Sequence, residues 1–170
     1  MKTIIYYKSN TGFTKEYVDL LKPRIECETA LKISKIKKND LKSSDNIIFM
    51  GPLLNNVILG LNKFLKYYDK MQNKNIFVFA VGIEPNTPQK KENVIAVNGL
   101  ELYHVRLYLL PGGFDINKYK GIKKLMMKTM FKIASKKHPE LSLITSQSIN
   151  QVNGINLDRM VDVFYKINKH

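Results

Sequence analysis

The 170-residue chain has no tryptophan and a single cysteine, Cys27, so it cannot form a disulfide bond within itself. Its three histidines, His104, His138 and His170, are scattered, and no two stand four residues apart. Cys27 has no cysteine or histidine neighbour at a spacing typical of metal ligands. The sequence therefore predicts no metal site, and we interpret Cys27 as a bystander near the end of the first helix.

Long apolar runs are also missing. No stretch approaches the roughly 20 apolar residues that a helix needs to cross a bilayer. The N-terminus lacks the basic start and long apolar stretch of a secretory signal. These absences predict a cytoplasmic protein. Because no linker, repeat or low-complexity tract divides the chain, we expect one domain over residues 1–170.

Acidic residues are scarce: 14 Asp and Glu stand against 28 Lys and Arg, which gives a formal net charge of +14. A field of this size favours polyanions, anionic membrane surfaces or acidic proteins. Lysine supplies most of the excess, and Asn and Ile are also abundant, so a biased genome is the alternative explanation. No nucleic-acid recognition motif appears, and base-stacking aromatics are not interleaved with the basic residues. We therefore predict no specific nucleic-acid binding.

The chain alternates between strand-like and helix-like patterns. The runs 46–51 and 75–82 are continuously apolar and end in glycine, which is typical of interior strands of a parallel sheet. With right-handed crossovers, the pattern predicts an α/β fold with a doubly wound five-stranded parallel sheet, order 2-1-3-4-5, and helices on both faces. Asn156 is the expected N-cap of the last helix. The expected strands are 3–7, 29–34, 46–51, 75–82 and 103–110. One helix is expected to begin after residue 14, and three others are expected at about 59–71, 122–136 and 157–167.

Three loops leave the carboxyl edge of this sheet at the switch between strands 1 and 3, where ligands bind in such folds. They are 9–14, 52–57 and 83–87, and a fourth, 111–115, lies one strand further out. In the first loop, hydroxyl groups and Gly12 precede a helix N-terminus, whose free N–H groups favour a phosphate. The alternative is a plain connection in which Thr11 or Thr14 caps the helix.

The hexapeptide Ser9–Thr14 resembles the phosphate loop of flavodoxins, Thr/Ser-x-Thr-Gly-x-Thr, at every specified position. The resemblance implies a flavodoxin-like fold and a noncovalent FMN. In that family the second and third loops clamp the isoalloxazine, often with aromatic side chains, but 52–56 and 83–86 here contain none. The resemblance assigns the phosphate to Ser9, Asn10, Thr11, Gly12, Phe13 (through its N–H) and Thr14, and the ring to Pro52, Leu53, Leu54, Asn55, Gly82, Ile83 and Glu84.

The segment 110–133 resembles the menaquinone-dependent protoporphyrinogen IX dehydrogenase branch of the same superfamily, through a Gly-containing turn and a Met- and Lys-rich helix. This implies an FMN oxidoreductase that acts on a quinone or porphyrinogen. The alternative is a one-electron carrier for a protein partner, and a remote alternative is a non-redox signalling domain of the same fold. No residue is singled out as a general acid or base; Asp115 and Tyr119 are expected near the flavin edge in structural roles.

Five lysines in and before the helix expected at 122–136 follow one another at a uniform spacing of four residues, with no acidic residue between them. Like charges at this spacing destabilise a helix by about 0.2–0.5 kcal/mol per pair. Our hypothesis is that this lysine row meets an anionic membrane, at its inner face, or an acidic partner. The alternative is a solvated face. The lysine row consists of Lys120, Lys124, Lys128, Lys132 and Lys136.

Overall fold

In a computed structural model, which describes residues 1–118, 121, 124, 129 and 148–169, a parallel sheet forms the centre of the molecule. Its strands follow the order β2-β1-β3-β5-β6. This order confirms the predicted 2-1-3-4-5 arrangement of a flavodoxin-like α/β fold. The strands are β1 (Thr3–Tyr7), β2 (Thr29–Lys32), β3 (Asn46–Leu54), β5 (Asn75–Gly82) and β6 (Arg106–Pro111).

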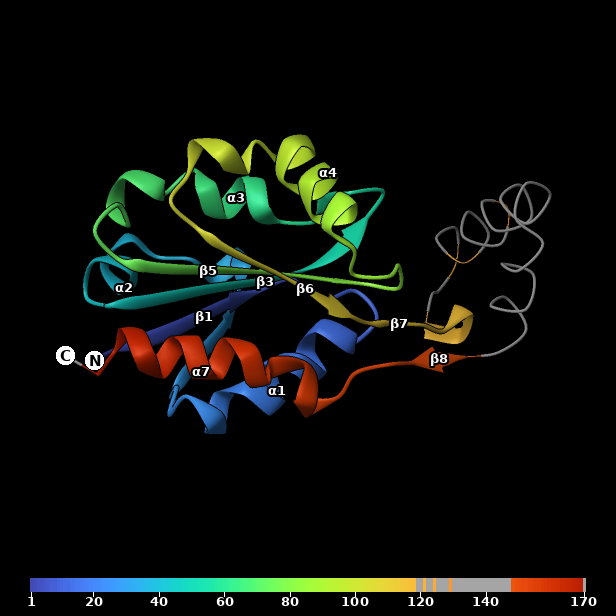
Figure 1. Ribbon diagram of the computed structural model, residues 1–170, viewed down its shortest axis with the longest axis horizontal. Helices are drawn as coiled ribbons and strands as arrows, with labels where there is room; N and C mark the ends of the chain where they lie inside the picture. The colour runs from blue at the N-terminus through green and yellow to red at the C-terminus, as the bar shows by residue number, and fades with distance from the viewer. Residues whose placement is uncertain (119–120, 122–123, 125–128, 130–147, 170) are drawn as a thin grey trace.

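Helices cover both faces of the sheet (Figure 1). The helices α1 and α7 lie on one face, and α3 and α4 lie on the other. The start of α4 is fixed by Thr87, whose side chain accepts a hydrogen bond from the N–H of Lys90, and by a proline at its first position. The helices are α1 (Phe13–Arg24), α2 (Lys38–Lys42), α3 (Leu61–Leu65), α4 (Pro88–Asn98) and α7 (Asp158–Ile167), with 3₁₀ helices η1 (Ile33–Lys35), η2 (Tyr68–Lys70), η3 (Leu100–Leu102), η4 (Ile116–Lys118) and η5 (Gly154–Leu157).

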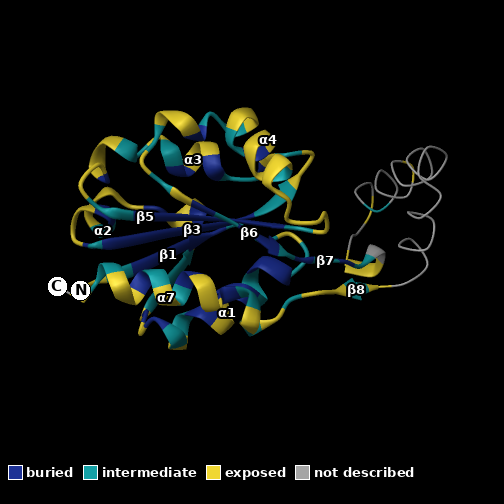
Figure 2. Ribbon diagram, viewed as in Figure 1, coloured by how far each residue is buried: buried dark blue, intermediate teal, exposed yellow. Residues whose placement is uncertain are grey.

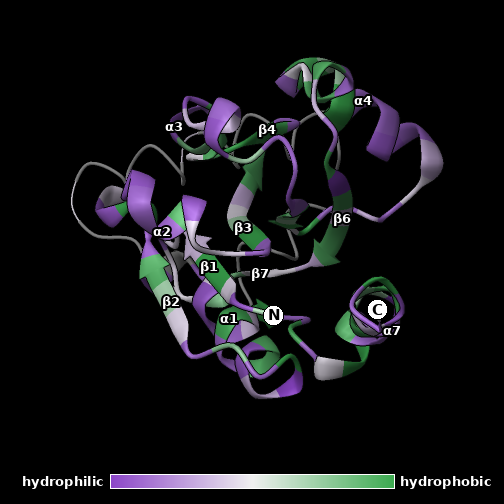
Figure 3. Ribbon diagram, turned by 90° about the vertical axis from the view of Figure 1, so that its left-hand side faces the viewer, coloured by the Kyte–Doolittle hydropathy of each residue, from purple (hydrophilic) through white to green (hydrophobic). Residues whose placement is uncertain are grey.

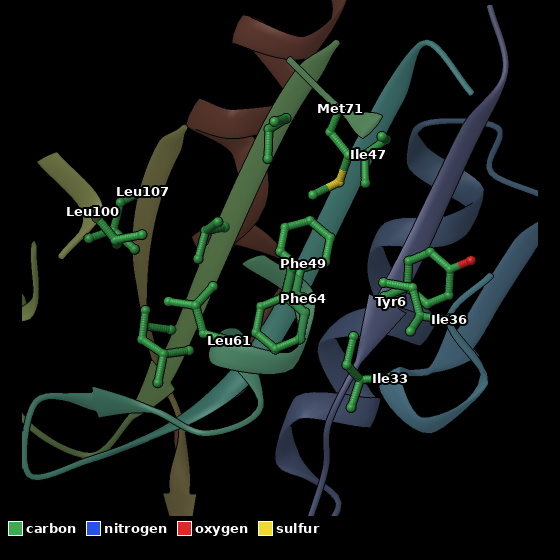
Figure 4. Close-up of a cluster of buried hydrophobic side chains, with 14 of the residues drawn as sticks. Tyr6, Ile33, Ile36, Ile47, Phe49, Leu61, Phe64, Met71, Leu100 and Leu107 are labelled. Carbon is green, nitrogen blue, oxygen red and sulfur yellow. The ribbon is translucent and has the colours of Figure 1, made fainter. Parts of the chain in front are cut away.

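The buried strands explain why the apolar runs are continuous (Figure 2). Successive side chains of β3 point to opposite faces and enter two separate hydrophobic clusters, one under each helical layer. Phe49 stacks on Phe64 of α3 with 5.1 Å between ring centroids (Figure 4), whereas Ile48 packs with Phe77 in the opposite cluster. Figure 3 shows the hydrophobic stretches along β3 and β6 and the mostly hydrophilic α2. The central strands are therefore buried on both faces, and their packing positions the carboxyl edge of the sheet.

Several predicted boundaries differ from the structure. The strand expected from residue 103 begins at Arg106, because η3 and a turn come first, and the one expected at 29–34 ends at Lys32, where η1 begins. The helix expected over 59–71 is divided between α3 and η2. Asn156 is not the N-cap of α7: it lies inside η5, and Leu157 precedes α7 without a side-chain cap.

Beyond Leu54 the chain forms a hairpin rather than the loop expected over 52–57. Asn55 and Asn56, with φ of 48° and 65°, connect β3 to β4 (Val57–Ile58), which pairs with it antiparallel. Two residues with positive φ match the right-handed twist of a tight hairpin, and Asn tolerates that conformation. The second loop at the carboxyl edge is therefore an ordered β-hairpin.

A second, two-stranded sheet lies beside the end of β6. It pairs β7 (Gly113–Phe114) with β8 (Ile149–Asn150) antiparallel, so the chain leaves and returns at one place. Tyr119 lies outside the described residues. So do the predicted helix over 122–136, apart from Lys124 and Thr129, and the lysine row, apart from Lys124, whose ammonium group donates to Asn117 Oδ1 at 3.3 Å. Within the part of the chain that the structure describes, no helix is long and apolar enough to cross a bilayer.

Candidate functional site

A cleft of about 180 Å³ opens at the carboxyl edge of β1, β3 and β5. The first three loops and β7 meet around it, as expected for the switch point of a doubly wound sheet. Of the predicted residues, Ser9, Asn10 and Gly12 do not line the cleft. It is lined by Thr11, Phe13, Thr14, Pro52, Leu53, Leu54, Asn55, Gly82, Ile83 and Glu84, which were predicted, and by Val81, Gly113 and Phe114, which were not.

The first loop leaves the start of α1 open. Gly12 is the N-cap of α1 with φ of +98°, a conformation that favours glycine, and no side chain caps the helix. The alternative in which Thr11 or Thr14 caps the helix is therefore wrong. Ser9 Oγ accepts a hydrogen bond from the Gly12 N–H at 3.2 Å and so shapes the turn. The first N–H groups of α1 have no partner within the helix and carry the positive end of its dipole.

The β3–β4 hairpin forms one wall of the cleft. Asn98 of α4 fixes the hairpin, because its Oδ1 accepts from the Ile58 N–H at 2.9 Å and its Nδ2 donates to the Asn56 carbonyl at 2.6 Å. Leu54 and Ile83 on the neighbouring loop are 44% and 38% exposed. These exposed apolar side chains offer a flat aromatic group a hydrophobic surface at the mouth of the cleft.

The third and fourth loops come into direct contact. The Gly112 N–H donates to the Gly82 carbonyl at 2.6 Å. A Cβ atom on Gly112 would lie 2.9 Å from Val81 Cγ1, and one on Gly113 would lie 2.5 Å from the Phe13 ring. Only glycine permits these approaches. They bring Phe114 into the lining of the cleft, and the glycine pair after a strand end is the sequence signal for this contact.

Tyr17 ties α1 to the fourth loop. Its hydroxyl donates to the Pro111 carbonyl at 2.6 Å and accepts from Asn156 Nδ2 at 2.8 Å. Burial raises the pKa of the Tyr17 phenol, so the hydroxyl keeps its proton and its role as donor. The amide of Asn156, expected to cap α7, instead serves this network.

Glu84 is a charged residue that lines the cleft, and Lys118 is a second charge close to the first loop. Glu84 pairs with Lys90 of α4. Lys118, which ends η4, places its Nζ 4.1 Å from the centroid of the Phe13 ring and 3.6 Å from Glu16 Oε1. Sequence reasoning missed Lys118, because only the return of the chain after β6 brings it to α1. Among the described residues, no group of His, Cys, Asp and Glu side chains could hold a metal ion.

Comparisons with known proteins agree with this architecture. The sequence matches a family model described as "Flavodoxin domain" over residues 4–140. No curated protein matches the chain.

Solved structures resemble the fold at low sequence identity. A Bacteroides eggerthii DSM 20697 protein, provisionally described as a flavoprotein, has a TM-score of 0.51 at 13% identity and covers 78% of this chain and 96% of its own. A flavodoxin from the domain Archaea has a TM-score of 0.48 at 18% identity, with 75% of this chain and 90% of its own covered. At such identities the likeness concerns the fold alone.

Proposed function

This chain belongs to the flavodoxin domain family, and this membership implies FMN as cofactor, so we propose that the protein is an FMN-dependent oxidoreductase. Its substrate class is a small molecule of quinone or porphyrinogen type. The observation that carries the proposal is the cleft, where an uncapped helix N-terminus and an apolar wall stand at the same edge of the sheet.

The residues at this edge fit FMN. A Cβ atom on Gly12 would meet nothing closer than Lys118 Nζ at 3.8 Å and Glu16 Oε1 at 3.9 Å, so no atom fills the space beside the backbone of the turn. The hydroxyls of Thr11 and Thr14, together with the first N–H groups of α1, can donate to a terminal phosphate. No Gly-x-Gly-x-x-Gly turn for a pyrophosphate is present, which favours FMN over FAD.

Each part of the cleft has a separate task. FMN, when bound, supplies the redox chemistry of its isoalloxazine ring, and the protein supplies binding, orientation and electrostatics. The first loop holds the phosphate. Leu53, Leu54 and Ile83 exclude water from the ring, and the neighbouring main-chain groups of Pro52, Asn55 and Gly82 to Glu84 border its edge.

A second cavity supports an enzyme rather than a carrier. It has a volume of about 480 Å³ and shares Leu53, Gly82, Ile83 and Glu84 with the cleft. It continues past Pro85 toward Lys90. A one-electron carrier needs no space for a substrate, whereas an enzyme must seat one beside the ring.

The test begins with purified protein loaded with FMN and reduced without oxygen. Reoxidation of the flavin is followed by its visible absorption after mixing with a water-soluble quinone, a porphyrin precursor or cytochrome c. We expect the wild type to react faster with a small molecule than with the cytochrome. Failure to bind FMN at all would overturn the proposal.

A bulky side chain provides the sharper test. Pro85→Trp should slow the small-molecule reaction at unchanged FMN affinity, because the indole fills the second cavity. The control is Leu102→Trp, which places the same indole on η3, where Leu102 is exposed and does not line either cavity. Equal rates in the two variants, with faster oxidation by cytochrome c, would favour the one-electron carrier.

A further inference from the structure

Lys118 is a cation at the phosphate loop that does not belong to the loop. Phe13 is the first residue of α1, and Lys118 Nζ lies above its ring. A Cβ atom on Gly12 would lie 3.8 Å from the same Nζ. The lysine comes from η4, which follows β7 directly, and not from the loop between β1 and α1. The uncapped helix N-terminus therefore has an ammonium group beside it.

An ion pair with Glu16 holds this lysine near α1. The Lys118 N–H donates to the Asp115 carbonyl at 3.1 Å. Glu16, in the first turn of α1, contacts Lys118 Nζ through Oε1, and its Oε2 accepts from Asn150 Nδ2 at 3.1 Å. Glu16 thus joins η4 and β8 to the start of α1.

The negative charge of Glu16 gives Lys118 a role in the binding of a phosphate. A carboxylate in the first turn stabilises the helix dipole, but it repels a phosphate dianion that binds at the same end. Lys118 offsets this repulsion, and its side chain is 37% exposed, which leaves it free to shift toward the loop. Lysine contributes to phosphate binding as a flexible point charge.

We propose that Lys118 binds the 5′-phosphate of FMN directly and sets the preference of the site for FMN over riboflavin. This inference rests on the proposed function, because it assigns one more residue to the same site. The phosphate then meets hydroxyl and N–H donors from the first loop and a cation from η4. Binding of FMN should weaken with rising salt, and binding of riboflavin should not.

The experiment measures dissociation constants for FMN and riboflavin by equilibrium dialysis with the apoprotein, at low and physiological salt. We expect Lys118→Gln to weaken FMN binding about 10-fold or more, the range for a hydrogen bond to a charged group, and to change riboflavin binding less than about 2-fold. Lys118→Arg should retain most of the affinity. The matched control is Lys70→Gln, because Lys70 is exposed, also ends a 3₁₀ helix, and precedes β5 at the opposite edge of the sheet.

Glu16→Gln separates a direct role from a structural one. If Lys118 acts on the phosphate, this variant should bind FMN at least as tightly as the wild type, because a repulsive charge is removed. If Lys118 only anchors η4 through Glu16, Glu16→Gln should weaken FMN binding as Lys118→Gln does, and the inference is wrong. Equal FMN affinity in Lys118→Gln and Lys70→Gln also overturns it while leaving the proposed function intact. A wild type without affinity for FMN overturns both.

Discussion

Replacement of Gly113 by alanine should disrupt the junction between the first and fourth loops. The added Cβ would lie 2.4 Å from the Ile149 carbonyl oxygen and 2.5 Å from the Phe13 ring, about 1 Å short of an ordinary contact. Phe13 is 4% exposed and cannot move aside freely, and a shift of Ile149 would separate β8 from β7. Overpacking of this kind costs about 1–3 kcal/mol, and the buried Phe13 ring favours the upper part of that range.

Thermal unfolding of the apoprotein, followed by circular dichroism, measures this cost. For a chain of this size 1 kcal/mol lowers Tm by roughly 2–4 °C, so Gly113→Ala should melt about 4–12 °C below the wild type. The control is Gly154→Ala, whose Cβ would meet only Arg24 Nη1, at 3.9 Å. It should change the stability by less than about 0.5 kcal/mol. If the two variants melt within about 2 °C of each other, the close contact of Gly113 with Phe13 and Ile149 is refuted.

Four further predictions concern separate parts of the molecule. Thr11→Ala should weaken FMN binding by roughly 1–3 kcal/mol and riboflavin binding much less, and equal losses in equilibrium dialysis would refute the phosphate role of the loop. Bound FMN should stay more fluorescent than in a protein with aromatic clamps, because no tryptophan or tyrosine lines the cleft; strong quenching on binding would contradict this. Burial, with a smaller contribution from Asp40, raises the pKa of Tyr6 from its ordinary 10.0 to about 12. The folded state therefore holds this proton more tightly, so the free energy of unfolding should fall by roughly 2–3 kcal/mol as pH rises from about 10 to about 12. In Tyr6→Phe, the free energy of unfolding, measured by urea denaturation at several pH values, should not show this decrease between pH about 10 and about 12. We also propose that the lysine row binds anionic vesicles at low salt; replacement of three lysines within 124–132 by glutamine should abolish co-sedimentation, and undiminished binding of that variant would exclude the row.

The sheet and the first loop could be predicted from the sequence because their signals are local. The continuous apolar runs follow from burial on both faces, and Gly12 follows from a turn that needs positive φ. The Asn55–Asn56 hairpin also has a local signal, two residues that tolerate positive φ between apolar pairs, although the prediction placed a loop there. That error is one of interpretation rather than of missing information.

Other parts of the site depend on contacts that no local pattern contains. Asn156 is a residue type that often caps helices, but a 3₁₀ turn moves the start of α7 by one residue, to Asp158, and the Asn156 amide bonds to Tyr17 instead. Lys118 is one lysine among many in a basic chain, and the course of the chain after β6 places it over Phe13 and beside Glu16. Tertiary contacts, not propensity, therefore decide which lysine has access to the phosphate loop.

The site has two parts, the first three loops and the residues next to the β7–β8 sheet, and the strands that support these two parts differ in stability. The first three loops leave β1, β3 and β5, whose central residues are fully buried, so a ligand meets a preformed edge at little ordering cost. Lys118 and Phe114 instead depend on a sheet of two-residue strands, which has little stability of its own. A phosphate held by both parts would stabilise the pairing of β7 with β8. By thermodynamic linkage, whatever displaces this pairing must weaken FMN binding by the same free energy. The affinity for FMN and the pairing of β7 with β8 are therefore coupled, so a change that separates Gly113 from Asn150 should also weaken FMN binding.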